Sequence, residues 1–569
     1  MSDELPPFGQ QSGPDLKRLI LTAVIMSVLI VVFNHFILPA PQKAPEQQQN
    51  VPAQQAQVAT HVEAPKAAPV VVAPVVTDEG VHPTPETVAL VKTPVRVDVT
   101  NASVESDPAW SKGGYQLVAD NAGAKIASMA VLGYRDPVNL ISGSHAALYG
   151  LRSRSSGTPV REDAAYEIVK SEPHELIYQR TTAEGLKLTR RYTFAADNYL
   201  VRHFIEVENT SQHVLKVDLD LVFKTDAVAE ESSLLAPAQN ELNFIAFQNG
   251  DLTRRGHSDV LKEKQIVTGG VDFVGFEQRY FLISMLPQNP NDILEVSATG
   301  TYTDQSKHQF DADMVVSLKS KELAAGAVAK WEIDAYAGPK QSSLLKSVGR
   351  GLEQTINFGW FGVISRPLLW LLVTIFGFVQ NFGIAIILLT LLIKLLTFPL
   401  TQKSFVSMEA MKKIGPEVKA LEKKYGHDRT TLSQKQMELY RERGVNPMAG
   451  CLPMLLQFPI WIALYQMLGN SIEIYQKPFM GWLTDLTAPD PLYILPVLMG
   501  ISMVVQQLMQ PVQEDQKAMR YAMLATSVLF TFIMLKLPSG LSLYMFTNNL
   551  LTLGQQFVIK RRFEVRTTA

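Results

Sequence analysis

A single lysine, Lys394, lies inside a strongly apolar stretch of this chain, residues 384–398, which reads IAIILLTLLIKLLTF. A lysine near the middle of a bilayer costs about 2.5–3.5 kcal/mol on insertion scales, so a charge kept there usually serves a function. Amide side chains punctuate other apolar stretches: Gln457, Gln506, Gln507, Asn548, Asn549, Gln555 and Gln556. A cation and several amides near one depth indicate a wet cavity open to the cytoplasm. The alternatives are that the amides only tie helices together, and that Lys394 extends its ammonium to the headgroups.

Residues that could catalyse a reaction are not arranged to do so. A serine protease needs a histidine beside its nucleophile, yet only His427, in a polar segment, follows residue 308. An aspartyl-type catalytic site needs paired carboxylates inside the membrane. The carboxylates of the C-terminal half closest to the apolar stretches instead fall in or beside predicted loops: Glu473, Asp485, Asp490, Glu514 and Asp515. Neither the phosphate-binding loop G-x-x-x-x-G-K-[ST] nor the zinc motif H-E-x-x-H occurs. We therefore expect no enzymatic activity, no cofactor and no metal.

Six apolar stretches are long enough to cross a membrane. They are residues 19–38, 381–400, 448–470, 492–509, 518–535 and 541–559. The first is predicted to be an uncleaved anchor, although a cleaved signal peptide is the alternative. A shorter apolar stretch, 366–379, lies in the connecting segment 341–380 and predicts an interfacial amphipathic helix rather than a span.

The segments between the first two spans differ sharply in composition. Residues 39–90 are rich in Pro, Gln and Ala and predict an extended linker that cannot bury enough apolar surface to fold. Residues 91–340 predict one large β domain. In KVDLDLVFK, alternate residues from Val217 to Phe223 are apolar, while Asp218 and Asp220 are expected to face water. Since helical periodicity is scarce here, a sheet sandwich is the expected architecture.

Basic residues predict the topology. The segment 401–446 carries ten Lys or Arg against six acidic residues, and the tail 560–569 begins KRRFEVR, so both are expected in the cytoplasm. The loop 471–491 has Lys477 as its only basic residue. With the N-terminus, 1–18, also cytoplasmic, the β domain is expected outside the cytoplasm, in agreement with its lack of cysteines. The single cysteine of the chain, Cys451, excludes an intrachain disulfide. Residues 401–447 predict a helical hairpin, either solvated or docking a partner.

Three stretches of the C-terminal half resemble one family closely. NPMAGCLPMLLQFPIWIALYQML (446–468), DPLYILPVLMGISM (490–503) and LPSGLSLYMFTNNLLTLGQQ (537–556) are similar to the YidC/Oxa/Alb membrane protein insertases. The anchor, linker and β domain resemble the Gram-negative bacterial YidC branch in layout, and GGVDFVGFEQRYFLISMLP (269–287) resembles a segment of it. The resemblance implies a five-helix insertase core in the bacterial inner membrane and a β-supersandwich domain in the periplasm.

The resemblance also implies a site. Lys394 takes the place of the cationic residue of a hydrophilic substrate groove, where most members have arginine; lysine keeps the charge but loses the planar bidentate fork. Gln507 and Tyr544 match polar groove positions. Phe458, Pro459 and Trp461 match an apolar face along which substrates slide, although packing or lipid contact would explain them equally.

The function implied is that of an insertase and chaperone for integral membrane proteins and some lipoproteins, working alone and with the Sec translocon. The expected partners are nascent membrane proteins, SecD and SecF, membrane lipid, and the ribosome through the hairpin and the basic tail; no small-molecule substrate is expected. Two alternatives remain. A secondary transporter usually shows internal repeats, which we do not find, and the β domain of this family resembles mutarotases, which leaves a sugar-binding role open.

Overall fold

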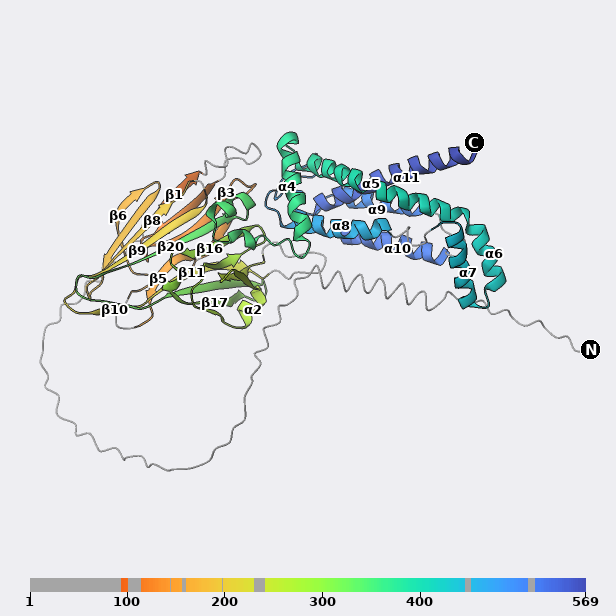
Figure 1. Cartoon of the computed structure of the whole chain (residues 1–569). Helices are drawn as coiled ribbons and strands as arrows, with labels where there is room; N and C mark the ends of the chain where they lie inside the picture. The colour runs from red at the N-terminus through yellow and green to blue at the C-terminus, as the bar shows by residue number, and fades with distance from the viewer. Residues whose placement is uncertain are drawn as a thin grey trace, which may run out of the picture.

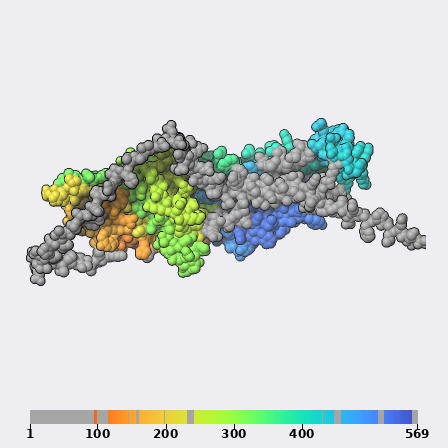
Figure 2. Space-filling model, turned by 90° about the horizontal axis from the view of Figure 1, so that it is seen from below, coloured from red at the N-terminus to blue at the C-terminus, as the bar shows by residue number. Residues whose placement is uncertain are grey.

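The computed structural model describes residues 94–100, 114–143, 145–155, 160–196, 198–229, 241–445, 452–509 and 517–568. The predicted N-terminus (1–18), anchor (19–38) and linker (39–90) lie outside these residues. A β domain (residues 94–340) is followed by a helical part (residues 342–568). Figure 1 shows the β domain at one end of the molecule and the helices α6 (Gly415–Tyr425) and α7 (Arg429–Glu442) at the opposite end, and Figure 2 shows the same order from a second direction.

The β domain is built on two large antiparallel sheets. In spatial order the first contains β1 (Pro94–Thr100), β2 (Gly114–Asp120), β3 (Lys125–Leu132), β5 (Ala147–Ser153), β11 (Leu219–Val228), β18 (Gln309–Leu318), β17 (Ile293–Asp304) and β14 (Gln265–Thr268), with β4 (Val138–Ile141) paired to β3. The second contains β13 (Asp251–Arg255), β12 (Asn243–Gln248), β15 (Phe273–Glu277), β16 (Phe281–Pro287), β20 (Val328–Pro339), β9 (Leu200–Asn209), β8 (Leu186–Phe194), β7 (Glu175–Thr181) and β6 (Glu167–Glu172). Four short elements complete the domain: β10 (Leu215–Val217), β19 (Lys321–Leu323), α2 (His257–Lys262) and η2 (Pro290–Asp292).

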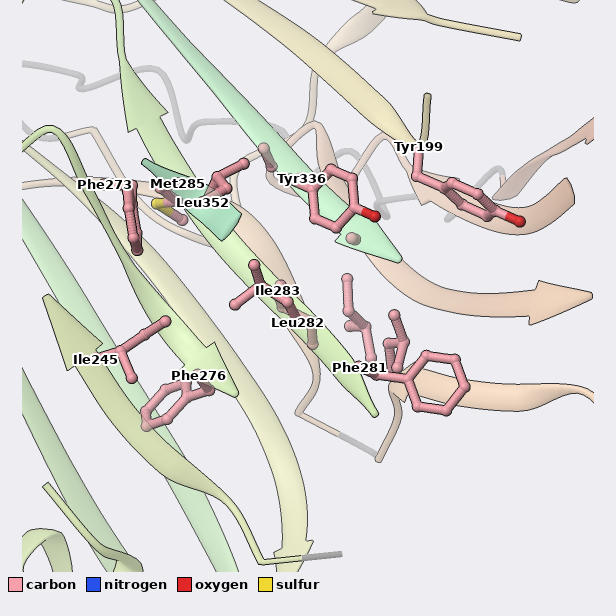
Figure 3. Packing of buried hydrophobic residues seen from close by; sticks show 14 of the residues in the cluster. Tyr199, Ile245, Phe273, Phe276, Phe281, Leu282, Ile283, Met285, Tyr336 and Leu352 are labelled. Atoms are coloured by element: carbon pink, nitrogen blue, oxygen red, sulfur yellow. The ribbon is translucent and has the colours of Figure 1, made fainter. Parts of the chain in front are cut away.

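The two sheets pack face to face around an aromatic and aliphatic core. Phe223 on β11 and Phe276 on β15 have ring centroids 5.6 Å apart, which joins one sheet to the other. Phe276 lies directly opposite Ile283 in the register of β15 and β16, and Figure 3 shows both among the side chains of this core. The predicted sheet sandwich is therefore confirmed.

One detail of the strand prediction is wrong. Asp218 and Asp220 were expected to face water, but each is only 5% exposed. The Ser317 hydroxyl donates to the Asp220 carboxylate at 2.8 Å, and Arg154 forms an ion pair with it at 3.4 Å. Residues distant in the chain therefore cover the polar face of β11 and supply hydrogen-bond and ion-pair partners for the carboxylate of Asp220.

A buried arginine ties the two sheets together. Arg190 on β8 donates from its two terminal nitrogens to the carbonyl oxygens of Gly123 and Tyr149, both at 2.5 Å. Its Nε donates to His203 Nε2 on β9 at 3.2 Å. Burial, with the Arg190 charge, holds the pKa of His203 well below its ordinary value, so the imidazole is neutral and can accept this bond. Tyr149 Oη in turn donates to the Ile333 carbonyl on β20 at 2.8 Å.

The helical part begins with short connecting elements and continues with long helices. Its elements are α3 (Ser342–Val348), η3 (Leu352–Thr355), α4 (Gly362–Val379), α5 (Phe382–Lys413), α6, α7, α8 (Leu452–Asn470), α9 (Ile494–Met509), α10 (Lys517–Met534) and α11 (Ser539–Thr568). Among the described helices, α4 and α5 are long and apolar enough to cross a membrane, while α9 and α10 are shorter apolar helices. The six predicted spans are therefore not confirmed as a set and stay a prediction.

Two helix ends differ from those that hydropathy predicts, and the predicted hairpin is divided. α5 continues to Lys413 and α11 to Thr568, past the predicted span ends at residues 400 and 559, because helix formation does not stop where apolar composition does. The first helix of the predicted hairpin is divided at Ile414, where α6 begins with Pro416 in its first turn. Proline suits that position because its missing amide hydrogen would have no partner there.

α4 is the helix predicted to be interfacial. Figure 1 shows it set steeply across the N-terminal end of α5. Its large apolar side chains Val363, Trp370 and Phe378 are 86%, 70% and 84% exposed. Both features suit a helix lying along a membrane surface with its apolar side chains in lipid, and the interfacial location stays a prediction.

The β domain docks on the end of α8 and on the segment after it. Arg279 Nε donates to Asn470 Oδ1 at 3.1 Å, and Tyr280 Oη donates to the Gly469 carbonyl at 2.8 Å. The ring of Tyr280 also lies 4.4 Å, centroid to centroid, from that of Tyr475. A cation and a hydroxyl therefore meet the C-terminal end of α8, where the helix dipole favours positive charge.

Tyr149 and Tyr178 offer a matched pair for testing how much the buried hydrogen bonds of the β domain contribute to its stability. Both are fully buried, but Tyr149 Oη donates to a carbonyl, whereas Tyr178 Oη has no hydrogen-bond partner among the described residues. Tyr149→Phe should lower the free energy of unfolding of the β domain by about 1–3 kcal/mol because a buried carbonyl loses its donor. Tyr178→Phe should leave it unchanged or raise it slightly. Denaturant titration of the two variants checks this, and equal losses would contradict it.

Glu473, in the segment that follows α8, should make the free energy of unfolding depend on pH. Burial raises the pKa of Glu473 from 4.5 to about 7, against opposing backbone hydrogen bonds including one from Ser342. The folded chain therefore holds a proton that the unfolded chain has lost between these values, so stability falls as pH rises from 4.5 to about 7 and then levels off.

Glu473→Gln should remove this part of the pH dependence, because the amide mimics the protonated acid. In thermal unfolding of the full chain, the variant should match the free energy of unfolding of the unsubstituted protein near pH 4 and exceed it near pH 7.5 by up to about 3 kcal/mol. A constant difference at every pH would contradict the assignment.

Candidate functional site

α5 has one polar and one apolar face. Thr390, Lys394, Thr397 and Thr401 follow one another at spacings of four, three and four residues, which places them on a single face. The three threonines are 1%, 9% and 6% exposed, and Lys394 is half-buried. On the other side, Leu396 is 81% exposed. A helix with polar groups inside and leucines outside is adapted to lipid rather than to water.

α11 carries a second polar face. Asn549, Thr552 and Gln555 recur every three residues and are buried, whereas Leu550 and Phe557 are exposed. Polar groups buried among membrane helices need partners on those helices, because lipid offers none. The question is therefore which partners the three side chains find.

Three hydrogen bonds join the polar face of α11 to its neighbours. Lys394 Nζ on α5 donates to Thr552 Oγ1 at 2.7 Å, Gln555 Nε2 donates to Thr401 Oγ1 on α5 at 3.0 Å, and Asn549 Nδ2 donates to Ser502 Oγ on α9 at 3.0 Å. We call these six residues the polar seam. The seam fixes α11 against both α5 and α9.

The three bonds have the same arrangement of donor and acceptor. Each hydroxyl donates its hydrogen to a carbonyl of its own helix: Thr552 to Asn548 at 2.7 Å, Thr401 to Thr397 at 3.1 Å, and Ser502 to Met499 at 2.5 Å. The hydroxyl oxygen is then left as an acceptor, and a longer side chain from the next helix donates to it. Threonine and serine thus serve here as oriented acceptors.

Lys394 lies deep along its helix. It follows Phe382, the first residue of α5, by a rise of roughly 18 Å, which is past the middle of a hydrocarbon core of about 30 Å. An ammonium has three donor hydrogens, and the described residues accept one of them, through Thr552. No carboxylate of the described residues lies within ion-pair distance of Lys394. As far as the described residues go, two donors and an unbalanced positive charge therefore remain for water or an anionic group.

The other two predicted groove residues lie in different surroundings. Tyr544 is buried on α11, and its hydroxyl oxygen accepts a hydrogen bond from Gln457 Nε2 on α8. Tyr544 thus joins α11 to a third helix. Gln507 is half-buried near the end of α9 and forms no hydrogen bond to any residue that the structure describes. No hydrogen bond joins either residue to Lys394 within the described part, so their role in one groove stays a prediction.

The predicted substrate slide lies on α8. Phe458 and Trp461 have ring centroids 6.5 Å apart, and Pro459 lies between them inside the helix. Trp461 is 9% exposed, and its ring lies 6.0 Å from that of Phe530 on α10. Trp461 is therefore turned toward α10, while Phe458 and Pro459 are half-buried. The sliding role of all three residues stays a prediction.

Several members of the seam were not singled out from the sequence. Thr552, Thr401 and Ser502 are hydroxyl residues of a kind that is common in membrane helices. A signal was nevertheless present, because Thr390, Thr397 and Thr401 share a helical face with Lys394, and Thr552 lies midway between Asn549 and Gln555. Spacing on a helix face, rather than residue type, is what distinguishes them.

Comparisons with known proteins give a consistent result. Two family models match the chain: "60Kd inner membrane protein" over residues 374–566 and "YidC periplasmic domain" over residues 112–371. A protein of Syntrophus aciditrophicus described as membrane protein insertase YidC is 31% identical over 572 residues, 96% of this chain and 99% of the relative. Another with the same description, from Magnetococcus marinus, is 37% identical over 383 residues, 67% of each chain. A crystal structure described as an active YidC insertase aligns with 78% of this chain and 92% of that chain, at 19% identity and a TM-score of 0.35.

Proposed function

The chain belongs to the YidC family of membrane protein insertases, and from this premise we propose that its polar seam lines a hydrophilic groove that receives the polar segments of nascent membrane proteins. An insertase is not an enzyme, so the task is physical. A polar tail or loop of the substrate must enter an apolar membrane, which is costly because its groups lose their water. A groove that supplies hydrogen bonds and a positive charge lowers that cost.

The position of Lys394 is the observation that carries this proposal. Its ammonium is held inside the helical part by Thr552 and has no acidic partner among the described residues. A charge placed in this way attracts an anionic segment strongly, since electrostatic interactions gain strength where water is scarce. The apolar helix of the substrate then moves into lipid, and burial of its apolar surface drives net insertion. Phe458, Pro459 and Trp461 would guide that helix.

The proposed orientation has the β domain in the periplasm and both chain termini in the cytoplasm. It is supported by the basic residues of the hairpin, which lies at the opposite end of the molecule from the β domain (Figure 1). Asp428 caps α7 by accepting from the amides of Thr430 and Thr431 at 3.0 and 3.2 Å, and Arg443 pairs with Glu417 at 2.8 Å. These contacts support a preformed hairpin that, with the basic tail, contacts the ribosome, whose RNA favours basic residues.

Further parts of the proposal rest on the family resemblance alone. We propose that the protein acts both independently and with the Sec translocon, including SecD and SecF. We also propose that it helps membrane proteins fold and assemble, and that some lipoproteins are among its substrates. The predicted contact of Gln507 and Tyr544 with substrate belongs to the same proposal.

Charge substitutions at Lys394 test the groove. Lys394→Glu should lower insertion of a substrate with an acidic translocated tail by at least about fivefold, because like charges a few ångströms apart repel by about 1–4 kcal/mol. Lys394→Arg keeps the charge and should change insertion by less than about twofold. Protease protection of the tail in vesicles containing the purified full-length variants measures both effects.

A second substrate provides the control. The same substrate with its tail carboxylates replaced by amides should insert nearly equally with the unsubstituted insertase and with the Lys394→Arg and Lys394→Glu variants, because its tail carries no charge to attract or repel. Undiminished insertion of the acidic tail by Lys394→Glu would remove the charge from the mechanism. A large loss in Lys394→Arg would show that the site needs lysine itself.

A further inference from the structure

We infer that Thr552 is a positioning residue for Lys394: its hydroxyl oxygen holds the ammonium against α11 and so fixes where the positive charge is presented to a substrate. The inference rests on the proposed function of Lys394. It goes beyond that function by assigning the placement of the charge to a threonine on another helix.

The geometry singles out Thr552. Lys394 Nζ lies 2.7 Å from Thr552 Oγ1, and no other described residue accepts a hydrogen bond from this ammonium. The hydroxyl hydrogen of Thr552 is directed to the Asn548 carbonyl at 2.7 Å, so its oxygen faces the lysine as an acceptor. A hydrogen bond to a charged donor is stronger than one between neutral groups.

Lysine needs such an anchor more than arginine would. Its ammonium is a compact charge at the end of a flexible four-carbon stem, without the planar fork that fixes a guanidinium. A free lysine inside a membrane would extend toward the headgroups. The bond to Thr552 instead directs the side chain from α5 to α11.

The neighbouring contacts keep the acceptor in place. Asn549, one turn before Thr552, is bonded to Ser502 on α9 at 3.0 Å, and Gln555, one turn after it, is bonded to Thr401 on α5 at 3.0 Å. These two bonds fix the rotation of α11 about its axis. Thr552 therefore presents its oxygen to Lys394 from a helix that is held on both sides.

Two substitutions at Thr552 separate the hydroxyl from the shape of the side chain. Thr552→Val keeps the branched shape and removes the acceptor, whereas Thr552→Ser keeps the acceptor. Each is made in the full-length chain with Lys394 and with Lys394→Gln, and reconstituted in vesicles. Insertion is measured for the acidic-tail substrate and for the same substrate with amides in its tail, and thermal unfolding verifies that each variant is folded.

We expect Thr552→Val to lower insertion of the acidic tail by about three- to tenfold, as for the loss of one interhelical hydrogen bond in a membrane. Insertion of the amide tail should not change, and Thr552→Ser should retain most of the activity. In the Lys394→Gln background, Thr552→Val should add nothing, because a residue that acts through Lys394 has no effect without it.

Several results would overturn the inference. They are an equal loss for both tails, a further loss in the Lys394→Gln background, a serine variant as impaired as the valine variant, or no loss in Thr552→Val. If Lys394→Gln alone left insertion of the acidic tail unchanged, the proposed role of the charge would fail first. A loss in Lys394→Gln without one in Thr552→Val would refute only the positioning role.

Discussion

The helical part is organised by one constraint: a polar side chain among membrane helices must find its partner on another helix, because lipid offers none. Among the described residues, α11 meets this constraint at four side chains. Its Tyr544, Asn549, Thr552 and Gln555 bond to residues of α8, α9 and α5. These residues span roughly 16 Å along the helix axis, which is about half of a bilayer core. The positions of three helices around α11 are therefore set by hydrogen bonds as well as by packing.

The same helices connect the seam to the β domain. Arg279 and Tyr280 hold the last residues of α8, Asn470 and Gly469, and Gln457 on α8 donates to Tyr544 on α11. A continuous series of contacts thus runs from the β domain through α8 to α11, the helix whose Thr552 accepts a hydrogen bond from Lys394. The β domain thus holds the C-terminal end of α8, and α11 is hydrogen-bonded to the same helix nearer its start.

Much of this architecture could be predicted from the sequence. Alternation and the scarcity of helical periodicity predicted the sandwich, and apolar stretches located the starts of α5, α8, α9, α10 and α11 to within a few residues. Lys394 stood out because a charge in such a stretch is costly. The ends of α5 and α11 could not be predicted from hydropathy, since both helices continue into polar sequence.

The missed features depend on residues far apart in the chain. Asp220 is buried because Ser317 and Arg154 reach it from other parts of the fold, and local alternation contains no sign of them. Thr552 meets Lys394 across a sequence separation of 158 residues. The segment 269–287 was recognised only as a family likeness, yet it carries the two residues that dock the β domain on α8. Helix-face spacing could have indicated Thr552, whereas the docking pair required the fold.

The central claim is that an acidic substrate tail passes beside the polar seam. The most direct test places a photoreactive diazirine residue in the tail of a ribosome-stalled nascent membrane protein and leaves the insertase itself unchanged. After illumination, mass spectrometry identifies the cross-linked peptides. The account predicts cross-links to residues 394–401 of α5 and 548–556 of α11. Cross-links confined to the exposed leucine face of α5, or to the β domain, would contradict it.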